Sequence, residues 1–250
     1  IEGMQMNTIQ SGIMVSSALA GFTDELLVFD LPFLFRNREH VYKVLDGTVG
    51  QELLKKLIDV GIVGAAYWEN GFRQVTNSKR PINSVNDIKG LKLRTMENQV
   101  HIDAFRALGV DPTPMAWSEV FTALQQGVID GQENPVPIIY VQKLIEAGQK
   151  YLAMTNHVYS PSLFLISAIT LERFDAKTRA VLVDTAKEVA VYERGLIKQM
   201  DEEQIGLLQK QGMVVTYPDQ AEFKAACQSI YTKYEERFDK KLIDNIINTK

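Results

Sequence analysis

The sequence has little cysteine and no long apolar run, and each absence excludes a class of protein. Cys227 is the one cysteine among 250 residues, so no disulfide can form within the chain. It stands in a helically spaced apolar run with Phe223 and Ile230, which indicates a core position rather than a nucleophile. The richest apolar run, residues 163–166, is strand-sized and falls far short of the roughly 18 residues of a membrane-spanning helix. The sequence therefore predicts neither a disulfide scaffold nor an integral membrane protein.

An excess of positive charge is also absent. The chain carries 27 Lys and Arg against 31 Asp and Glu, a formal net charge of −4. Such a chain has no electrostatic attraction for phosphate backbones or for an anionic membrane, so we expect no nucleic-acid partner. Apolar residues at 46% and charged residues at 23% are average for a globular protein and exclude a disordered chain.

The common signatures of enzymes are missing as well. No G-x-G-x-x-G, G-x-x-x-x-G-K-[ST] or G-x-S-x-G run is present. The three histidines, His40, His101 and His157, lack the spacing of a zinc site, so we expect no metal and no cofactor. His101 and Asp103 form an H-x-D pair, but two positions apart on a helix they face different directions. We expect that pair on a solvated surface.

Turn residues divide the chain into alternating strand-like and helical segments. Predicted strands are short apolar runs, at residues 62–68, 91–96, 128–129, 151–154, 163–167 and 213–217. Predicted helices show apolar residues at three- and four-residue spacing, over residues 37–59 and after the capping residues Asn98, Ser118 and Asp219. This alternation with short connections is typical of the α/β class with mostly parallel strands.

Residues 176–211 form an unusually long helical pattern. The segment contains no proline and stops at Gly212. As one helix it would be about 54 Å long at 1.5 Å per residue, more than one small lobe can cover. We therefore expect a helix that runs across two lobes, with a break at Gly195 as the alternative.

Two arginines stand where an α/β fold binds ligands. Arg94 lies near the carboxyl end of the strand predicted at residues 91–96, and ligands bind outside such strand ends. A guanidinium there can hold a carboxylate through two parallel hydrogen bonds. The alternative is a solvated strand face shared with Lys92. Arg73 follows the run WENGF as a second anion contact or as the ion-pair partner of Glu69.

An aromatic residue and a polar loop lie in the same region. Trp117 precedes the predicted helix cap at Ser118, where it either stacks on a ligand or packs in the core. Residues 130–135, DGQENP, suit recognition of hydroxyl groups by amides and carboxylates, and a plain surface turn is the alternative.

At these residues the sequence resembles the extracytoplasmic solute-binding proteins of TRAP transporters, the DctP-like family. The matching runs are VFDLPFLF (28–35), WENGFR (68–73), TNSKRPINS (76–84), DIKGLKLRTMEN (87–98), PTPMAWSEVFTALQQGVIDGQENP (112–135) and YLAMTNHVYSP (151–161). They cover nearly the whole chain, and the block from 87 to 135 is highly specific to the family.

The resemblance implies roles for particular residues. Arg94 in the KLR run would form a salt bridge with the substrate carboxylate, and Arg73 would be a second anion contact. Asn134 of GQENP would contact the ligand, and Trp117 of PMAW would line the pocket. His157 of TNH lies near the cleft in some members. Glu69 and Glu97 occupy positions that vary in the family, where they would tune recognition of hydroxyl groups.

The resemblance also implies a two-lobed α/β fold that closes on an organic acid, with a long helix spanning both lobes. Residues 1–70 and 161–200 would form lobe 1, and residues 71–160 and 201–250 would form lobe 2. Family members usually carry a further N-terminal segment that supplies one wall of the site. We therefore expect that the N-terminal part of lobe 1 is missing from this sequence.

The function that we expect is binding and not catalysis. A monomeric periplasmic protein would capture a small organic acid and deliver it to the TRAP membrane permease. Six polar residues near the predicted pocket favour a sugar acid or another hydroxylated monocarboxylate: Glu69, Asn70, Glu97, Asn98, Glu133 and Asn134.

Three alternatives remain open at this point. The first is a C4-dicarboxylate held by both Arg73 and Arg94. The second is an enzyme that acts on a small organic acid with Glu97 or Glu133 as general base. The third is a sensor whose closed lobes contact a receptor instead of a permease.

Overall fold

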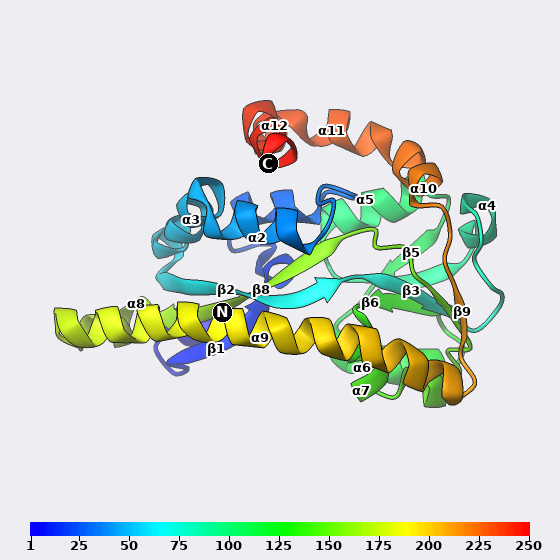
Figure 1. The fold of residues 1–250 in the computed structure, drawn as a ribbon, viewed down its shortest axis with the longest axis horizontal. Helices are drawn as coiled ribbons and strands as arrows, with labels where there is room; N and C mark the ends of the chain where they lie inside the picture. Colours follow the sequence, from blue (N-terminus) through cyan, green and yellow to red (C-terminus); the bar gives the residue numbers. More distant parts are fainter.

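Two β-sheets form the framework of the fold, which a computed structural model describes over residues 1–250 (Figure 1). The smaller sheet has the strand order β1-β8-β2, with bounds Ser11–Val15, Tyr159–Ser167 and Ile62–Phe72. The larger sheet has the order β5-β4-β6-β3-β7-β9, with bounds Asp111–Pro114, Lys92–Thr95, Gly131–Asn134, Gln74–Asn77, Tyr151–Ala153 and Val214–Thr216. The α/β class predicted from the sequence is confirmed.

The expectation of mostly parallel strands is wrong. Both pairs of the smaller sheet are antiparallel, and β3 is antiparallel to both of its neighbours in the larger sheet. The reason is the path of the chain, which enters the larger sheet through β2 and β3 and leaves it through β7 and β8. These two crossings run in opposite directions and pair with each other. Only β4–β5, β4–β6 and β7–β9 are parallel.

Helices cover both faces of the sheets (Figure 1). Above the sheets in that view lie α2 (Arg38–Asp46), α3 (Thr48–Lys55), α5 (Gln99–Ala107), α11 (Gln228–Phe238) and α12 (Lys240–Asn248). Below them lie α6 (Trp117–Gln125), α7 (Val136–Val141) and α9 (Ala176–Lys210). The remaining short α-helices are α1 (Glu2–Gln5), α4 (Val85–Ile88), α8 (Ala168–Glu172) and α10 (Gln220–Ala226).

The long helix α9 is continuous over 35 residues, so the alternative of a break at Gly195 is wrong. It passes along both sheets, and it contacts β2 at one end and α7 and β9 at the other. Small residues let it approach the smaller sheet, because Ala186 and Ala190 pack against Ala65 and Ala66 of β2. The expectation of one helix that spans both lobes is confirmed.

The ends of several predicted elements differ in the structure. Asn98 and Asp219 cap α5 and α10 as predicted. The helix predicted over 37–59 is interrupted at Gly47, which has extended backbone between α2 and α3. No strand forms at residues 128–129, because these belong to the turn that leads from α6 into β6. The Ser118 cap is also wrong, since α6 already begins at Trp117, with Ala116 as its N-cap.

Apolar side chains form one large core and two smaller ones. The large core contains 38 buried residues and joins the elements above both sheets. Cys227 is buried in it, as predicted, and burial raises the pKa of its thiol to about 12, so the thiol is inert at neutral pH. No helix is both long enough and apolar enough to span a membrane.

Gly131, the first residue of β6, provides a test of how closely β6 packs between β3 and β4. A Cβ atom at this position would lie 2.0 Å from the Thr76 carbonyl oxygen and 2.8 Å from Leu93 Cδ2. The added methyl group would force β6 away from β3 and β4. We therefore expect Gly131→Ala to lower the free energy of unfolding by about 3 kcal/mol in urea titrations. Gly206→Ala on α9 is the matched control: it meets no atom within 4 Å and should raise stability by about 0.5–1 kcal/mol. Equal free energies of unfolding in the two variants would contradict the close packing of β6 against β3 and β4.

Candidate functional site

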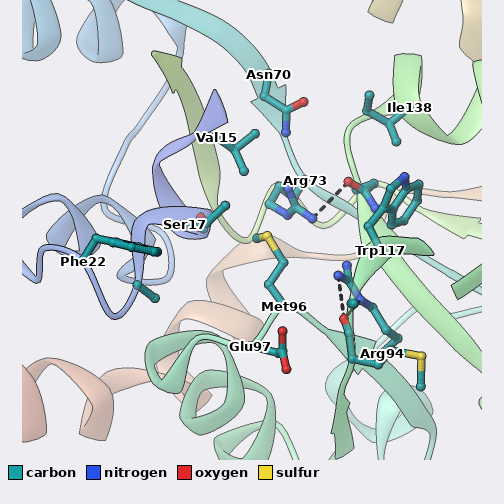
Figure 2. A pocket seen from close by; sticks show the side chains of 15 residues that line it. Val15, Ser17, Phe22, Asn70, Arg73, Arg94, Met96, Glu97, Trp117 and Ile138 are labelled. Atoms are coloured by element: carbon teal, nitrogen blue, oxygen red, sulfur yellow. Dashed lines mark hydrogen bonds between the residues drawn. The ribbon is translucent and has the colours of Figure 1, made fainter. Parts of the chain in front are cut away.

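A cavity of about 580 Å³ is lined by residues from both sheets (Figure 2). One wall comes from residues 15–22, around a 3-10 helix, η1 (Ser16–Leu19). The other comes from the ends of β4 and β6 and from the first turns of α6 and α7. Six lining side chains are polar: Ser17, Asn70, Arg73, Arg94, Glu97 and Asn134. The volume is in the usual range for a small-molecule site.

Arg94 is a buried cation without a counter-ion. Its side chain extends from β4 into the cavity and is 4% exposed, whereas Lys92 on the same strand is exposed, so a shared solvated face is wrong. Nε and Nη2 donate hydrogen bonds to the Met115 carbonyl oxygen, at 3.0 and 2.9 Å. Burial lowers the pKa of Arg94 to about 10, which leaves it charged at neutral pH.

The other two buried arginines each have a carboxylate partner. Arg73 pairs with Glu133, and Arg194 pairs with Asp46 at 2.6 and 2.9 Å. No ion-pair partner within the chain reaches Arg94, and its Nη1 donates no hydrogen bond to the protein. An uncompensated buried charge is costly. The cavity therefore holds a guanidinium that is available to an anion.

Trp117 lies over the Arg94 guanidinium, with 5.5 Å between Arg94 Cζ and the ring centroid. The position of Trp117 at the start of α6 directs the indole into the cavity, where it remains 38% exposed. This cation–π contact holds the guanidinium on one side and leaves the other side open. Figure 2 shows the two side chains together at one end of the cavity.

Arg73 lies at the junction of β2 and β3 and is almost completely buried. The sequence-based alternative of an ion pair with Glu69 is wrong. Arg73 Nε pairs with Glu133, and Nη2 donates to Glu133 Oε1 at 2.9 Å and to Asn134 Oδ1 at 3.1 Å. The positive charge of Arg73 is therefore neutralised within the protein, although the side chain lines the cavity.

Glu133 and His157 lie behind the cavity wall and do not line it. His157 Nε2 is 3.2 Å from Glu133 Oε2, and its Nδ1 is 2.8 Å from Thr155 Oγ1. Burial alone would raise the pKa of Glu133, but the Arg73 charge and the hydrogen bonds from His157 and Arg73 offset it and hold the pKa well below its ordinary value. Burial lowers the pKa of His157, so the imidazole is neutral at pH 7. Glu133 has no free oxygen with which to act as a general base.

Asn134 lines the cavity, and each end of its amide makes one hydrogen bond within the chain. Its Oδ1 accepts from Arg73, and its Nδ2 donates to Gln132 Oε1 at 2.5 Å. The segment DGQENP is not a loop, because residues 131–134 form β6 between β3 and β4. Pairing on both edges explains why polar residues in this strand are buried.

Glu69 turns away from the cavity. It accepts a hydrogen bond from Arg38 Nε at 2.7 Å and one from Tyr42 at 2.5 Å. Arg38 also pairs with Asp201 of α9. Glu69 thus belongs to a buried network that ties α2 and β2 to the long helix. In contrast, Glu97 lines the cavity, is exposed, and makes no hydrogen bond within the chain.

The expectation that His101 and Asp103 form a solvated surface is wrong, because both faces of α5 are covered. His101 Nε2 lies 3.1 Å from Asp30 Oδ1, and both side chains are fully buried. Asp103 accepts hydrogen bonds from Lys233 and Tyr234 of α11, at 2.5 and 2.7 Å. The H-x-D pair therefore contacts two different neighbouring segments.

Apart from Trp117, the sequence did not reveal the apolar part of the cavity. Nine of the fifteen lining residues are apolar, and they include Val15, Phe22, Met96, Met115 and Ile138. These residues occur in unrelated segments, and their periodicity is that of ordinary core positions. Two predicted residues lie close to some of them in the sequence and could have drawn attention to them, since Met96 follows Arg94 and Met115 precedes Trp117.

Comparisons with known proteins find matches over almost the whole chain. The family described as bacterial extracellular solute-binding protein, family 7, matches residues 1–237. A solute-binding protein of Verminephrobacter eiseniae is 41% identical over 247 residues, which cover 98% of this chain and 73% of the relative. The chain belongs to the solute-binding protein family of TRAP transporters.

Solved structures of TRAP periplasmic solute-binding proteins have the same fold. One from Bordetella bronchispeptica, with density interpreted as pantoate, superposes with a TM-score of 0.97 at 45% identity. One from Polaromonas, bound to D-erythronate, superposes with a TM-score of 0.97 at 41% identity. Each comparison covers 100% of this chain and 82% of the other. The chain spans 73%, 65% and 69% of the first three curated relatives that it matches.

The Glu133 contacts in this TRAP solute-binding protein predict a pH-dependent loss of stability. Glu133→Gln leaves the buried Arg73 without a counter-charge, so we expect the free energy of unfolding at pH 7 to fall by about 3 kcal/mol in urea titrations. The pKa of Glu133 is lower in the folded chain, so its contribution is complete above the ordinary value of 4.5 and is lost as the pH falls below it. The difference in free energy of unfolding between the Glu133→Gln variant and the natural chain should therefore become smaller as the pH falls below 4.5.

Glu146→Gln is the matched control for this prediction. Glu146 is 61% exposed and forms only a surface pair with Lys143. Its substitution should leave the unfolding curve almost unchanged at every pH. A Glu133→Gln variant as stable as this control at pH 7 would refute the account of the buried ion pair.

Proposed function

We propose that this chain binds a small hydroxylated monocarboxylate, such as a sugar acid, and delivers it to a TRAP membrane permease. The observation that carries the proposal is Arg94. It is the one buried arginine without a carboxylate partner, and it lies in a cavity with room for a ligand. A ligand carboxylate would accept from Nη1, which the protein leaves free, and from the second N–H of Nη2.

The charges around the cavity favour one ligand carboxylate over two. Arg73 is already neutralised by Glu133, so Arg94 is the only uncompensated cation among the lining residues. A second carboxylate would meet the negative charge of Glu97 and would find no further uncompensated cation in the cavity. This repulsion argues against a C4-dicarboxylate, whose two anionic groups need two free cations.

Structural neighbours support the same class of ligand. D-erythronate in the Polaromonas protein and pantoate in the Bordetella protein are both hydroxylated monocarboxylates. An enzymatic role receives no comparable support, because Glu133 is fully engaged with Arg73 and His157. Glu97 makes no hydrogen bond within the chain that would orient it as a general base.

The lobes are proposed to close around the bound acid and to present a closed surface to the permease in the periplasm. The smaller sheet lies mainly in residues 1–70 and 161–200, and the larger sheet lies in residues 71–160 and 201–250. Residues from both sheets line the cavity, so a ligand there contacts both lobes. The helix α12 packs on α3 and links the C-terminus to lobe 1.

A substitution of Arg94 tests the proposed function. A panel of sugar acids, hydroxy acids, keto acids and C4-dicarboxylates is screened by thermal shift, and the best acid is measured by calorimetry. Arg94→Ala leaves the bound carboxylate unpaired, so we expect a loss of roughly 3–5 kcal/mol in binding free energy. Arg94→Lys should restore only part of it, since an ammonium cannot form two parallel hydrogen bonds.

The control is Arg106→Ala, which removes an arginine that is 62% exposed on α5 and remote from the cavity. The affinity of the Arg106→Ala variant for the best acid of the panel should equal that of the natural chain. Unchanged affinity in Arg94→Ala, or the tightest binding for a C4-dicarboxylate, would overturn the proposal.

A further inference from the structure

We propose that Glu97 makes the site selective for hydroxy acids over oxo acids of the same carbon skeleton, because it accepts a hydrogen bond from a ligand hydroxyl. This inference rests on the proposed function, in which Arg94 binds the ligand carboxylate, and it names the ligand group that Glu97 recognises. Sugar acids and simpler hydroxy acids both carry such a group.

The backbone beside Glu97 is held in place by Asn98, the N-cap of α5. Asn98 Oδ1 accepts from the Val100 N–H at 2.9 Å, and Nδ2 donates to the buried Asp30 at 2.7 Å. The Asn98 backbone N–H donates to the Met96 carbonyl oxygen at 2.8 Å. Asn98 is therefore buried within the protein, whereas the neighbouring Glu97 and Met96 side chains line the cavity (Figure 2).

Glu97 is the one lining side chain that is a carboxylate. An ionised carboxylate only accepts hydrogen bonds, whereas the guanidinium groups of Arg73 and Arg94 only donate them. Glu97 is exposed and makes no hydrogen bond or ion pair within the chain. Its two oxygens can therefore accept from a ligand donor, whichever other groups also contact the ligand.

Arg94 and Glu97 bring opposite charges to one cavity without forming an ion pair. Burial lowers the pKa of Arg94 to about 10, and the charges of Glu133 and Glu97 act in the opposite direction. The Glu97 carboxylate is thus close enough to act electrostatically on the guanidinium that would hold the ligand. A ligand hydroxyl directed to Glu97 gains a hydrogen bond to a charged acceptor while the ligand carboxylate stays on Arg94.

A hydroxyl and an oxo group meet Glu97 in opposite ways. The hydroxyl donates its proton, but an oxo oxygen has only lone pairs, which face those of the carboxylate without a hydrogen bond. Sites built to bind a substrate hydroxyl reject the analogue without it by roughly 10⁴–10⁵-fold. Because Glu97 is exposed and water competes for it, we expect a smaller preference, of about tenfold.

The experiment measures dissociation constants by calorimetry for two matched pairs of acids. These are 2-hydroxybutanoate with 2-oxobutanoate, and 3-hydroxybutanoate with 3-oxobutanoate, with each hydroxy acid measured as both enantiomers. The members of a pair share their carbon chain and carboxylate, so the Arg94 contact is common to both. In the natural chain we expect at least one hydroxy acid to bind at least about tenfold more tightly than its oxo analogue.

Two variants of Glu97 test the origin of this preference. Glu97→Gln keeps the size of the side chain but adds an amide that can donate to an oxo oxygen. Glu97→Ala removes the acceptor. Each variant should lower the ratio of hydroxy-acid to oxo-acid affinity at least about fivefold. The ratio is the readout because the loss of a negative charge strengthens the binding of every anion alike.

Glu119→Gln is the matched control. Glu119 lies in the first turn of α6, is exposed and does not line the cavity. Its substitution also removes one negative charge close to the site, but no contact with the ligand. The ratio of affinities should therefore equal that of the natural chain.

The outcomes separate this inference from the proposed function. A preference for a hydroxy acid that falls in the Glu97 variants, but not in Glu119→Gln, supports the inference. Equal or tighter binding of both oxo acids, a preference that either folded Glu97 variant retains, or failure of all four acids to bind overturns it. Binding of any panel acid that is insensitive to Arg94→Ala overturns the proposed function instead.

Discussion

The ion pair between Arg73 and Glu133 is the interaction on which the site depends. Arg73 lies where β2 passes into β3, and Glu133 lies in β6, so the pair holds the crossing between the sheets against the strand that ends in Asn134. The Arg73 backbone N–H also donates to the Val158 carbonyl oxygen, at 2.8 Å, in the return crossing. A buried pair of this kind contributes little net stability compared with an apolar pair, but removal of either partner is costly. Its value here is positional, because it fixes one wall of the cavity and cancels one of the two positive charges beside it.

That cancellation leaves Arg94 as the only uncompensated positive charge of the cavity, and the protein supports it in other ways. The Met115 carbonyl accepts from two of its nitrogens, and Trp117 covers one face, so the guanidinium is oriented before any ligand arrives. An oriented cation in a low-dielectric wall attracts a carboxylate more strongly than a mobile one on the surface, because neither water nor side-chain entropy competes as effectively. The proposed selectivity for one carboxylate rests on this single uncompensated charge.

The sequence allowed the α/β class, the long helix and the burial of Cys227 to be predicted, because each depends on a local pattern. The 176–211 segment showed unbroken helical spacing, and Gly195 did not interrupt it. The roles of charged residues were harder to predict, because a partner can lie anywhere in the sequence. The sequence offers the nearby Glu69 as one alternative partner for Arg73, yet its partner is Glu133, sixty positions away. His101 and Asp103 were placed on the surface, because nothing in the α5 sequence shows that η2 (Glu25–Asp30) and α11 cover it.

Some polar residues of the predicted site do not face the cavity, for the same physical reason. Counted along the sequence, Glu69, Glu133 and Asn134 are candidates for binding hydroxyl groups. In the fold, Glu69 binds Arg38 and Tyr42, Glu133 binds Arg73, and Asn134 bridges Arg73 and Gln132. A buried polar group has to be satisfied by the protein before it can serve a ligand, and each such internal bond removes one recognition site. Ligand recognition is therefore set by the hydrogen bonds that the protein leaves unmade, which in this cavity are those of the Nη1 atoms of Arg73 and Arg94 and of the Asn70 and Glu97 side chains.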